Sequence, residues 1–295
     1  MSIVNGHARW AYDFRAWKPT MHDLKIAVSL IQPEEKKRLS KFMFQEDFKA
    51  SLCGRLLMRY FVRNAMSINN HQFKLGRDLK QKPYLKEINC ATNWEEKIIE
   101  FNVSHQGSLA CLAGYVSDKT EINTSTKLGV DVMKIEYSGG KSLSEFFRLM
   151  TRNFSDNEWK QIKTFDTNIG KLEAFMRNWC LKESYVKATG TGLTEDLRKL
   201  NFIIKTSRME ENEVITDTKL ESDGKTLENY HFEESLLGKE HCVAVCFHNH
   251  RPSTDFLPPL PFKLIQFEEL IENATPLSEV DEIYCAEILK KDTKT

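Results

Sequence analysis

One stretch of the sequence places a carboxylate and an ammonium group at the spacing of a single helix face. Between Arg177 and Gly190, the residues Trp179, Glu183 and Lys187 follow one another at intervals of four. Residues four apart are neighbours on an α-helix, so this acid and this lysine can act together on a metal ion and a phosphate. The same spacing is typical of an exposed ion pair on an amphipathic helix, which contributes little to stability.

A second acid, Asp131, interrupts an apolar segment from Gly129 to Ile135 that alternates as a strand does. Burying a carboxylate without a partner is costly, so this side chain needs a cation or hydrogen-bond donors. Mg²⁺ takes oxygen ligands, usually one or two carboxylates completed by water and substrate phosphates. Asp131 and Glu183 match that description on condition that the fold brings them together. The alternative is an aspartate at a strand end that caps a turn.

Two other segments offer the donors that bind phosphate. The first combines an amide, a hydroxyl, an imidazole and backbone N–H groups where a predicted strand ends, at Asn102, Val103, Ser104 and His105. The second is basic and comprises Arg38, Arg77, Lys80 and Lys82. Each has an ordinary alternative, because a lone histidine near a strand end is usually a satisfied polar side chain and separate basic residues are usually solvated.

Composition narrows the class of protein. The chain has 295 residues, 41% of them hydrophobic, which is enough for a packed core in one large domain or two small ones. Its 42 Lys and Arg balance 42 Asp and Glu, so no net charge attracts nucleic acid or an anionic membrane. No segment reaches the length of a membrane span, and the first residues lack the apolar core of a secretion signal. Seven cysteines without a CxxC pair indicate free thiols, so we expect a cytosolic protein.

Periodicity predicts the elements that must position these residues. A half-buried helix from Asp47 to Met66 carries Arg55, Arg59 and Arg63 as a basic stripe. Gly190 is expected to cap a helix rather than to open a dinucleotide-binding loop, because no strand precedes it. Further helices are predicted from Pro33 onward, at 142–165 and at 171–189, and strands at 98–105, 109–115, 128–135, 200–205, 214–220 and 241–247.

The order of helix, turn and central strand occurs twice, which predicts an α+β protein built from two similar subdomains. We expect an N-terminal subdomain at 1–120, a C-terminal subdomain at 121–250 and a partly disordered tail at 251–295. A cleft between two such halves is where a ligand is expected.

Three of these motifs, in this order, resemble those of the Sfp-type 4'-phosphopantetheinyl transferases. They are Asn102 to His105, Gly129-Val130-Asp131 and Trp179 to Lys187, and the stretches Gln32 to Arg38 and Lys82-Pro83 are similar too. The resemblance extends from about Trp10 through Phe247 and is strongest to the animal members of the family.

The resemblance implies a fold, an activity and a set of partners. The fold is the 4'-phosphopantetheinyl transferase fold, with two pseudo-symmetric α/β subdomains and the active site in the cleft between them. The activity is that of a holo-(acyl-carrier-protein) synthase type of transferase. It moves 4'-phosphopantetheine from coenzyme A to a serine of an apo acyl or peptidyl carrier protein, depends on Mg²⁺ and releases adenosine 3',5'-bisphosphate. We expect a monomer that binds neither nucleic acid nor membrane.

The resemblance also implies roles for individual residues. Asp131 and Glu183 match magnesium ligands, and Glu183 and Lys187 match catalytic residues. Positions that match the coenzyme A site, with His105 near the 3'-phosphate, are Arg38, Arg77, Asp78, Leu79, Lys80, Gln81, Lys82, Asn102, Val103, Ser104 and His105. Met133 departs from the pattern, because many members of the family have a second acid there, and this implies a metal held by two side chains and water.

Two other functions remain alternatives at this point. One is a non-catalytic module that binds coenzyme A or a carrier protein, in which the acids serve only the structure. The other is an oxidoreductase that uses the glycines at 190 and 192, and the missing strand before them argues against it.

Overall fold

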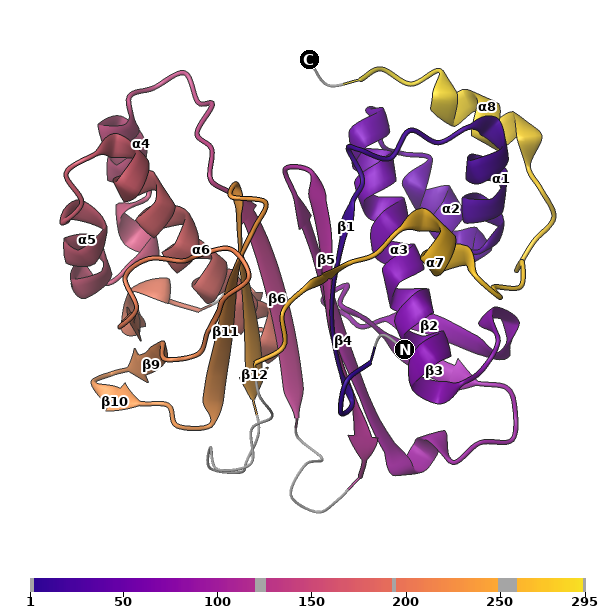
Figure 1. Ribbon diagram of the computed structural model, residues 1–295, viewed down its shortest axis with the longest axis horizontal. Coiled ribbons are helices and arrows are strands. Elements are labelled where there is room, and N and C mark those ends of the chain that lie inside the picture. The colour runs from indigo at the N-terminus through magenta and orange to yellow at the C-terminus, as the bar shows by residue number, and fades with distance from the viewer. Residues whose placement is uncertain (1–2, 120–125, 193–194, 249–258, 294–295) are drawn as a thin grey trace. The chain divides into compact units, whose positions relative to one another are not determined.

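A long helix packed on one face of an antiparallel sheet recurs in the two parts of the computed structural model (Figure 1). The structure describes residues 3–119, 126–192, 195–248 and 259–293. Its first unit consists of Met1–Lys119 and Phe262–Thr295, and its second of Thr120–Pro261. The subdomain boundary expected at 120 and the first residues of the expected tail, 251–258, lie outside the described residues.

In the first unit, helix α3 (Gln45–Met66) covers a sheet of strand order β13-β1-β5-β4. Phe61 of α3 packs between the rings of Trp10 and Phe101, with centroid separations of 6.0 Å to each. A separate hairpin, β2–β3, completes the unit. The elements are β1 (His7–Asp13), α1 (Met21–Ser29), α2 (Pro33–Leu39), β2 (Phe73–Arg77), β3 (Pro83–Ile88), β4 (Lys97–Gln106), β5 (Leu109–Asp118), β13 (Lys263–Leu264), α7 (Phe267–Ile271) and α8 (Glu282–Leu289).

The C-terminal segment is part of this unit, so the expectation of a separate, partly disordered tail is wrong for the described residues from Phe262 onward. Strand β13 adds to the edge of the sheet in parallel with β1, and α8 lies against α1 (Figure 1). Leu270 and Ile288 are buried in the core of the first unit. Arg63 of α3 donates hydrogen bonds to the carbonyls of Leu270 and Glu272, both at 2.7 Å. The prolines before this segment suggested a tail, but its later residues supply buried surface.

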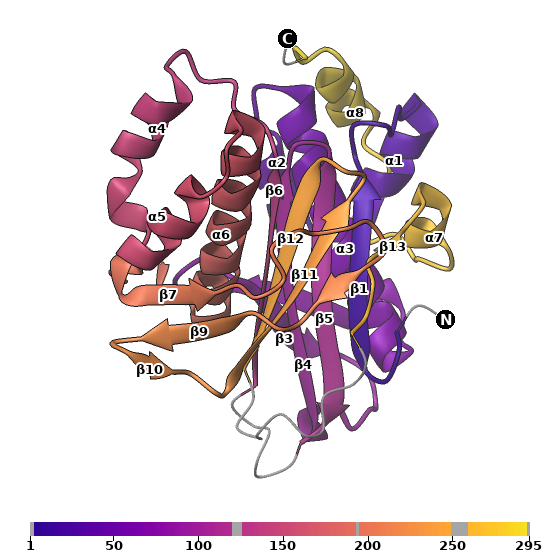
Figure 2. The ribbon, with the colours of Figure 1, turned by 60° about the vertical axis from the view of Figure 1, so that its left-hand side comes forward.

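In the second unit, helix α6 (Asn168–Thr189) covers an antiparallel sheet of order β6-β12-β11-β8. A smaller sheet, β10-β9-β7, lies beside α5 (Figure 2). Phe147, Trp159 and Phe175 form part of an aromatic core under α6. The elements are β6 (Lys127–Lys134), α4 (Leu143–Leu149), α5 (Asp156–Lys163), β7 (Leu200–Ile203), β8 (Val214–Ile215), β9 (Lys219–Ser222), β10 (Lys225–Thr226), β11 (Tyr230–Leu237) and β12 (His241–His248).

The α+β class is confirmed, and so are both long helices and strands β4, β5, β6 and β12 of the sheets that they cover. The single helical region predicted at 142–165 divides into α4 and α5, because Ser155 starts a new helix. Its hydroxyl accepts a hydrogen bond from the Glu158 amide at 3.2 Å, while Glu158 bonds back to the Ser155 amide at 2.7 Å. Strands β1 and β11 were not predicted.

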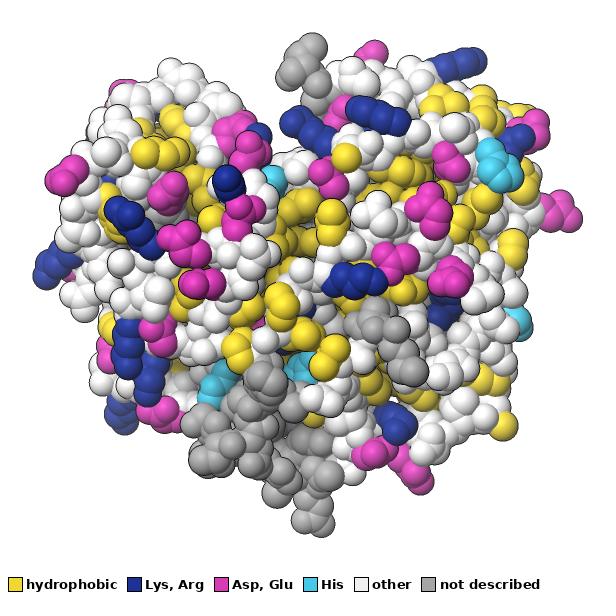
Figure 3. All heavy atoms as spheres, viewed as in Figure 1, with side chains coloured by type: hydrophobic (Ala, Val, Ile, Leu, Met, Phe, Trp, Pro, Cys, Tyr) yellow, Lys and Arg dark blue, Asp and Glu magenta, His cyan; other side chains and the backbone are white. Residues whose placement is uncertain are grey.

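Two further observations concern the charge on the surface and the apolar length of the helices. Basic and acidic side chains are interspersed over the face that Figure 3 shows. Within the described ranges, no helix is both long enough and apolar enough to span a membrane.

Candidate active site

Helix α6, which carries Glu183 and Lys187, is fixed at both ends and in its middle. Thr167 caps its start, where Oγ1 accepts a hydrogen bond from the Gly170 amide at 3.1 Å. At the other end Gly190 has φ of 67°, the left-handed conformation that glycine adopts without strain, so the predicted cap is confirmed. Trp179 stacks on Phe175 at a centroid separation of 6.4 Å, which anchors the middle of the helix in the aromatic core.

Strand β6 brings Asp131 against the last turns of α6. A Cβ added at Gly129 would lie 2.5 Å from Ala188 N and closer still to Ser184 O, so strand and helix touch backbone to backbone there. Two residues along the same face of the strand, Asp131 Oδ1 accepts a hydrogen bond from Lys187 Nζ at 2.6 Å. Asp131 is 5% exposed and pairs with Ala244 inside the ladder. It is therefore a buried strand residue and not a turn cap.

Glu183 lies one turn before Lys187 and within range of the charge on Asp131. Burial raises the pKa of the Glu183 carboxyl, the negative charge of Asp131 raises that pKa further, and the positive charge of Lys187 opposes both effects. The three side chains therefore act as one electrostatic unit of two carboxylates and one ammonium group. The alternative of an ordinary exposed ion pair on α6 is wrong, because Lys187 bonds to a buried acid of a neighbouring strand.

The donor set of this unit suits Mg²⁺. Two neighbouring carboxylates repel each other and are relieved by a cation, and Mg²⁺ commonly takes one or two carboxylates with water and phosphate oxygens. Met133, next on the same face of β6, packs against the apolar core of the second unit. No three or more His, Cys, Asp or Glu side chains gather into a metal-sized group anywhere in the described chain. Asp131 and Glu183 are the two side chains of this unit whose oxygens would suit such an ion, with water and phosphate oxygens completing its shell.

A second set of predicted residues meets in the first unit, between α2 and the loop from Arg77 to Lys82. Arg38 Nη1 donates to Gln81 Oε1 at 3.0 Å, and Arg77 Nη1 donates to the Gln81 carbonyl at 2.9 Å. Gln81 has φ of 68°, so the loop turns sharply at the residue that both arginines contact. The structure thus brings together two basic residues that are 39 positions apart in the sequence.

Asp78 shapes the rest of this loop. Its Oδ1 accepts hydrogen bonds from the amides of Lys80 and Lys82, both at 2.8 Å, in an Asx-type turn. Lys82 Nζ lies 3.9 Å from Glu100 Oε2 of β4. Leu79 at the tip is fully exposed. The loop therefore has a defined backbone and presents its side chains outward.

The third predicted group, Asn102 to His105, belongs to β4 and pairs residue by residue with β5. The strand continues one residue beyond the predicted end, and the turn follows it. Val103 faces α3, since its methyl group lies 3.4 Å from where a Cβ on Gly54 would be. Asn102 and Ser104 therefore point to the opposite face of the sheet. The alternation separates these four side chains into two pairs.

Similarity to known proteins covers both units. Residues 15–117 match the family model described as 4'-phosphopantetheinyl transferase, N-terminal, and residues 127–246 match that of the 4'-phosphopantetheinyl transferase superfamily. L-aminoadipate-semialdehyde dehydrogenase-phosphopantetheinyl transferase from Xenopus laevis is 35% identical over 287 residues, covering 95% of this chain and 91% of that protein. The chain belongs to the 4'-phosphopantetheinyl transferase family. The resemblance of its three motifs to this family is confirmed.

Two further named proteins and one solved structure are similar to this chain to different extents. The Homo sapiens protein with the same name as the Xenopus one is 35% identical over 284 residues, covering 92% of this chain and 88% of that protein. A phosphopantetheinyl transferase from a Thraustochytrium species is 32% identical over 261 residues, covering 86% and 83%. A crystal structure of holo-(acyl-carrier-protein) synthase from Thermotoga maritima aligns with a TM-score of 0.31 and 21% identity, over 42% of this chain and 64% of that one.

Lys182 of the transferase, next to Glu183 in the sequence, has a structural task that sequence reasoning missed. Its Nζ lies 2.9 Å from Glu158 Oε2 and donates to the carbonyls of Leu197 and Leu200 at 2.7 and 2.8 Å. Both charged side chains are fully buried. Burial lowers the pKa of Lys182 and raises that of Glu158, and their mutual attraction opposes both shifts. The pair ties α6 to α5 and to the turn before β7.

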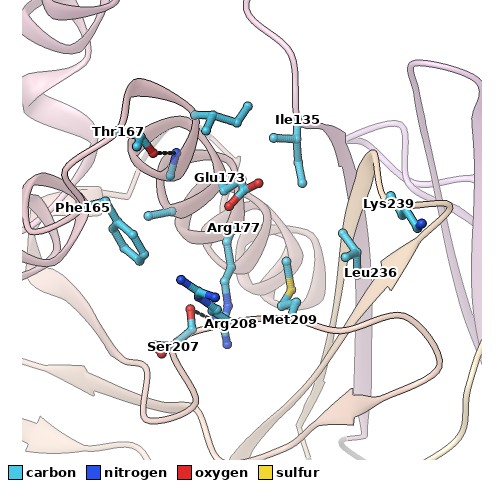
Figure 4. A pocket seen from close by; sticks show the side chains of 13 residues that line it. Ile135, Phe165, Thr167, Glu173, Arg177, Ser207, Arg208, Met209, Leu236 and Lys239 are labelled. Atoms are coloured by element: carbon cyan, nitrogen blue, oxygen red, sulfur yellow. Dashed lines mark hydrogen bonds between the residues drawn. The ribbon is translucent and has the colours of Figure 1, made fainter.

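Arg177, one of the first residues of the same motif, also supports the fold. It donates from Nε and Nη2 to the Glu234 carboxylate at 2.6 and 3.0 Å, and from Nη1 to the Thr206 carbonyl at 2.8 Å. Figure 4 shows its side chain in the wall of a cavity of about 340 Å³. This cavity includes Phe165 and Gly170, so it lies at the opposite end of α6 from Lys187. It is separate from the carboxylate pair.

Proposed function

We propose that this transferase moves 4'-phosphopantetheine from coenzyme A to a serine of apo acyl or peptidyl carrier proteins, as a holo-(acyl-carrier-protein) synthase type of enzyme. The observation that supports this proposal is the unit formed by Asp131, Glu183 and Lys187 on touching elements. Two carboxylates and a lysine held together suit a metal-assisted displacement at a diphosphate, where charge neutralisation and positioning supply most of the acceleration.

In this proposal, Asp131 and Glu183 would hold Mg²⁺ through their carboxylate oxygens. When bound, the ion neutralises charge on the diphosphate and on the leaving oxygen. Lys187 adds a second positive charge at a fixed place, because its hydrogen bond to Asp131 restrains an otherwise flexible side chain. The lysine therefore contributes charge without first having to be ordered.

The transfer forms one phosphorus–oxygen bond and breaks another. The serine oxygen of the carrier bonds to the phosphorus that bears the pantetheine. The bond from that phosphorus to the oxygen of the neighbouring phosphate breaks, and adenosine 3',5'-bisphosphate leaves with the electron pair. We assign the serine proton to the Glu183 carboxylate, directly or through a water. Burial and the Asp131 charge raise the pKa of Glu183 in the protein without metal, and a bound Mg²⁺ would oppose that rise.

We further propose that the basic group of the first unit binds a phosphate of coenzyme A. Arg38 and Arg77 converge on Gln81 with defined geometry, and Lys80 and Lys82 extend the positive charge along the loop. Arginine presents several donors in one plane, which suits phosphate oxygens. Asn102 to His105 are assigned to the same ligand on the strength of the motif.

A mass measurement on a carrier protein tests the proposal. Incubation of an apo-carrier with coenzyme A, Mg²⁺ and the transferase is expected to add one phosphopantetheine mass, and a chelator is expected to prevent the addition. The Glu183→Gln variant is expected to fold and to lose most turnover, by about a hundredfold or more. Glu173→Gln is the matched control, because Glu173 is an exposed acid on the same helix.

Three outcomes would contradict parts of this scheme. Binding of coenzyme A or the carrier without a mass gain would instead favour a non-catalytic binding module. Full turnover by Glu183→Gln would show that Glu183 is neither the base nor a required metal ligand. Transfer that continues in excess chelator would remove the role of the metal.

A further inference from the structure

The basic stripe that the sequence places on α3 is not a surface feature. Arg55 has only 11% of its side chain exposed, and Arg59 and Arg63 are buried. Arg63 bonds to the C-terminal segment, as described above, whereas Arg55 and Arg59 reach the N-terminal turn of α2. One helical turn separates Arg55 from Arg59, so they contact two points of α2 that are likewise about one turn apart.

The first contact point is Gln32, which joins α2 to strand β2. The side-chain amide of Gln32 pairs with the backbone of Leu75, as a residue of a neighbouring strand would. Its Oε1 accepts a hydrogen bond from the Leu75 backbone N–H at 2.9 Å, and its Nε2 donates one to the Leu75 carbonyl at 3.1 Å. Arg59 Nη1 donates to the same Oε1 at 3.0 Å and is itself bonded to Asn70. This buried network fixes the distance between α2 and β2 at Leu75.

The second contact point is Glu35, three residues further along α2. Its carboxylate accepts from Arg77 Nε at 2.9 Å and Arg77 Nη2 at 3.1 Å, and from Arg55 Nε at 2.7 Å. Arg77 is two residues beyond Leu75, on the same face of β2. Burial raises the pKa of Glu35, but the hydrogen bonds and charges of Arg77 and Arg55 outweigh burial and hold that pKa below its usual value. The carboxylate therefore stays ionised between the two arginines.

We propose that Glu35, backed by Arg55, is a positioning residue that holds the Arg77 guanidinium in the orientation needed to bind a phosphate of coenzyme A. This inference rests on the proposed function. Two N–H groups of Arg77 are used by Glu35 and one by the Gln81 carbonyl, so the plane of the guanidinium is fixed, and with it the positions of the two other N–H groups. Arg38 shares Gln81 and is oriented through the same loop.

Two opposing effects of Glu35 must be separated. Its negative charge weakens phosphate binding nearby, whereas its hydrogen bonds keep Arg77 in place. Without a carboxylate, the largely buried Arg55 would repel Arg77: burial lowers the pKa of Arg55, the charge and hydrogen bond of Glu35 oppose this, and the positive charges of Arg77 and Arg38 lower that pKa further. Glu35→Asp separates the effects, because it keeps the charge and withdraws the carboxylate by roughly 1.5 Å, the length of one carbon–carbon bond.

Steady-state kinetics of Glu35→Asp and Glu35→Gln test the proposal. We expect the KM for coenzyme A to rise about tenfold in both variants, while kcat and the KM for the carrier protein stay within twofold of the wild-type values. Glu87→Gln is the matched control, because Glu87 pairs with Lys74 of the same hairpin at 3.0 Å and does not contact Arg77. Its kinetic constants are expected to equal those of the wild type.

A double-mutant cycle with Arg77→Met shows whether Glu35 acts through Arg77. If it does, Glu35→Asp has little further effect once Arg77 is absent. Additive losses, a fall in stability with an unchanged KM for coenzyme A, or tighter coenzyme A binding by Glu35→Gln would each overturn the proposal. If the wild type binds coenzyme A but transfers nothing, the proposed function fails and calorimetric titration with coenzyme A still tests the role of Glu35. A wild type that does neither overturns both.

Discussion

Replacing Gly129 by alanine should separate the two elements that carry the acids. A Cβ at this position would lie 2.5 Å from Ala188 N and closer still to the carbonyl oxygen of Ser184. Non-bonded carbon contacts are most favourable near about 3.5–4.0 Å, so the methyl group requires a movement of roughly 1 Å. The obstructing atoms are helix backbone, which cannot rotate away. Either α6 moves off β6 or the strand bends.

The size of the effect follows from this geometry. Extra volume in a packed interface typically costs about 1–3 kcal/mol, and we expect a loss in this range in the free energy of unfolding, measured by urea titration. Asp131 lies two residues from Gly129 and its hydrogen bond to Lys187 spans the same contact. A displacement of about 1 Å at a reacting centre can cost roughly a hundredfold in rate. We therefore expect kcat of the folded variant to fall by a similar factor.

A glycine without such a neighbour provides the control. Apart from Gly140 and its two chain neighbours, no atom lies within 4 Å of a Cβ added at Gly140, so Gly140→Ala is expected to keep the wild-type stability and turnover. If Gly129→Ala unfolds at the wild-type urea concentration and turns over at the wild-type rate, the close approach of β6 and α6 does not position the acids.

Three other substitutions test the buried ion pair, the pH dependence of stability and the packing of Met133. Lys182→Met leaves Glu158 buried without its cation and should cost about 3–5 kcal/mol in urea titration, with part recovered by Glu158→Gln in the same chain. Burial and, to a smaller extent, the charge of Arg9 lower the pKa of His7 to about 3, so the folded protein holds this imidazole neutral and loses stability as the pH falls below the pKa of His7 in the unfolded chain. His7→Gln should therefore reduce the difference in unfolding free energy between pH 7 and pH 5 by about 2 kcal/mol. An unchanged difference would refute this reasoning. Met133→Glu should lower stability by about 1–3 kcal/mol, because it places a carboxylate against the apolar core; a wild-type melting midpoint would contradict the packing described here.

The long helices and central strands were predictable because their periodicity is set by burial on one face. The 3.6-residue pattern of α3 and α6 and the apolar runs of β5 and β12 remain visible in the sequence whatever their partners are. Strand β11 lacks such a pattern, because Glu233 and Glu234 interrupt it. Glu234 is nevertheless buried, since Arg177 satisfies its carboxylate with two hydrogen bonds. Pairing of this kind joins residues 57 positions apart and leaves no local signal.

The predicted site residues show the same contrast between what a local sequence pattern indicates and what depends on a distant contact. The motif identified Asp131, Glu183 and Lys187, but not that the lysine bonds to the aspartate. It also set Lys182 beside Glu183 without distinguishing a fully buried structural lysine from a half-buried acid of the candidate site. One position along a helix turns a side chain by about 100°, so consecutive residues face the core and the site in turn. The elements packed against α6 determine which of its residues are structural and which face the candidate site: α5 pairs with Lys182, and β6 pairs with Lys187.

The charge balance of the second unit explains how two acids can serve an anionic substrate. Asp131 and Glu183 together with Lys187 leave one net negative charge, which by itself repels a diphosphate. A divalent cation reverses that sign to one net positive charge, so metal and diphosphate would each favour the binding of the other. A third carboxylate at Met133 would return the balance to zero. In the proposed scheme, the apolar side chain of Met133 would forgo a metal ligand and would leave the metal-bound site with a net positive charge toward coenzyme A.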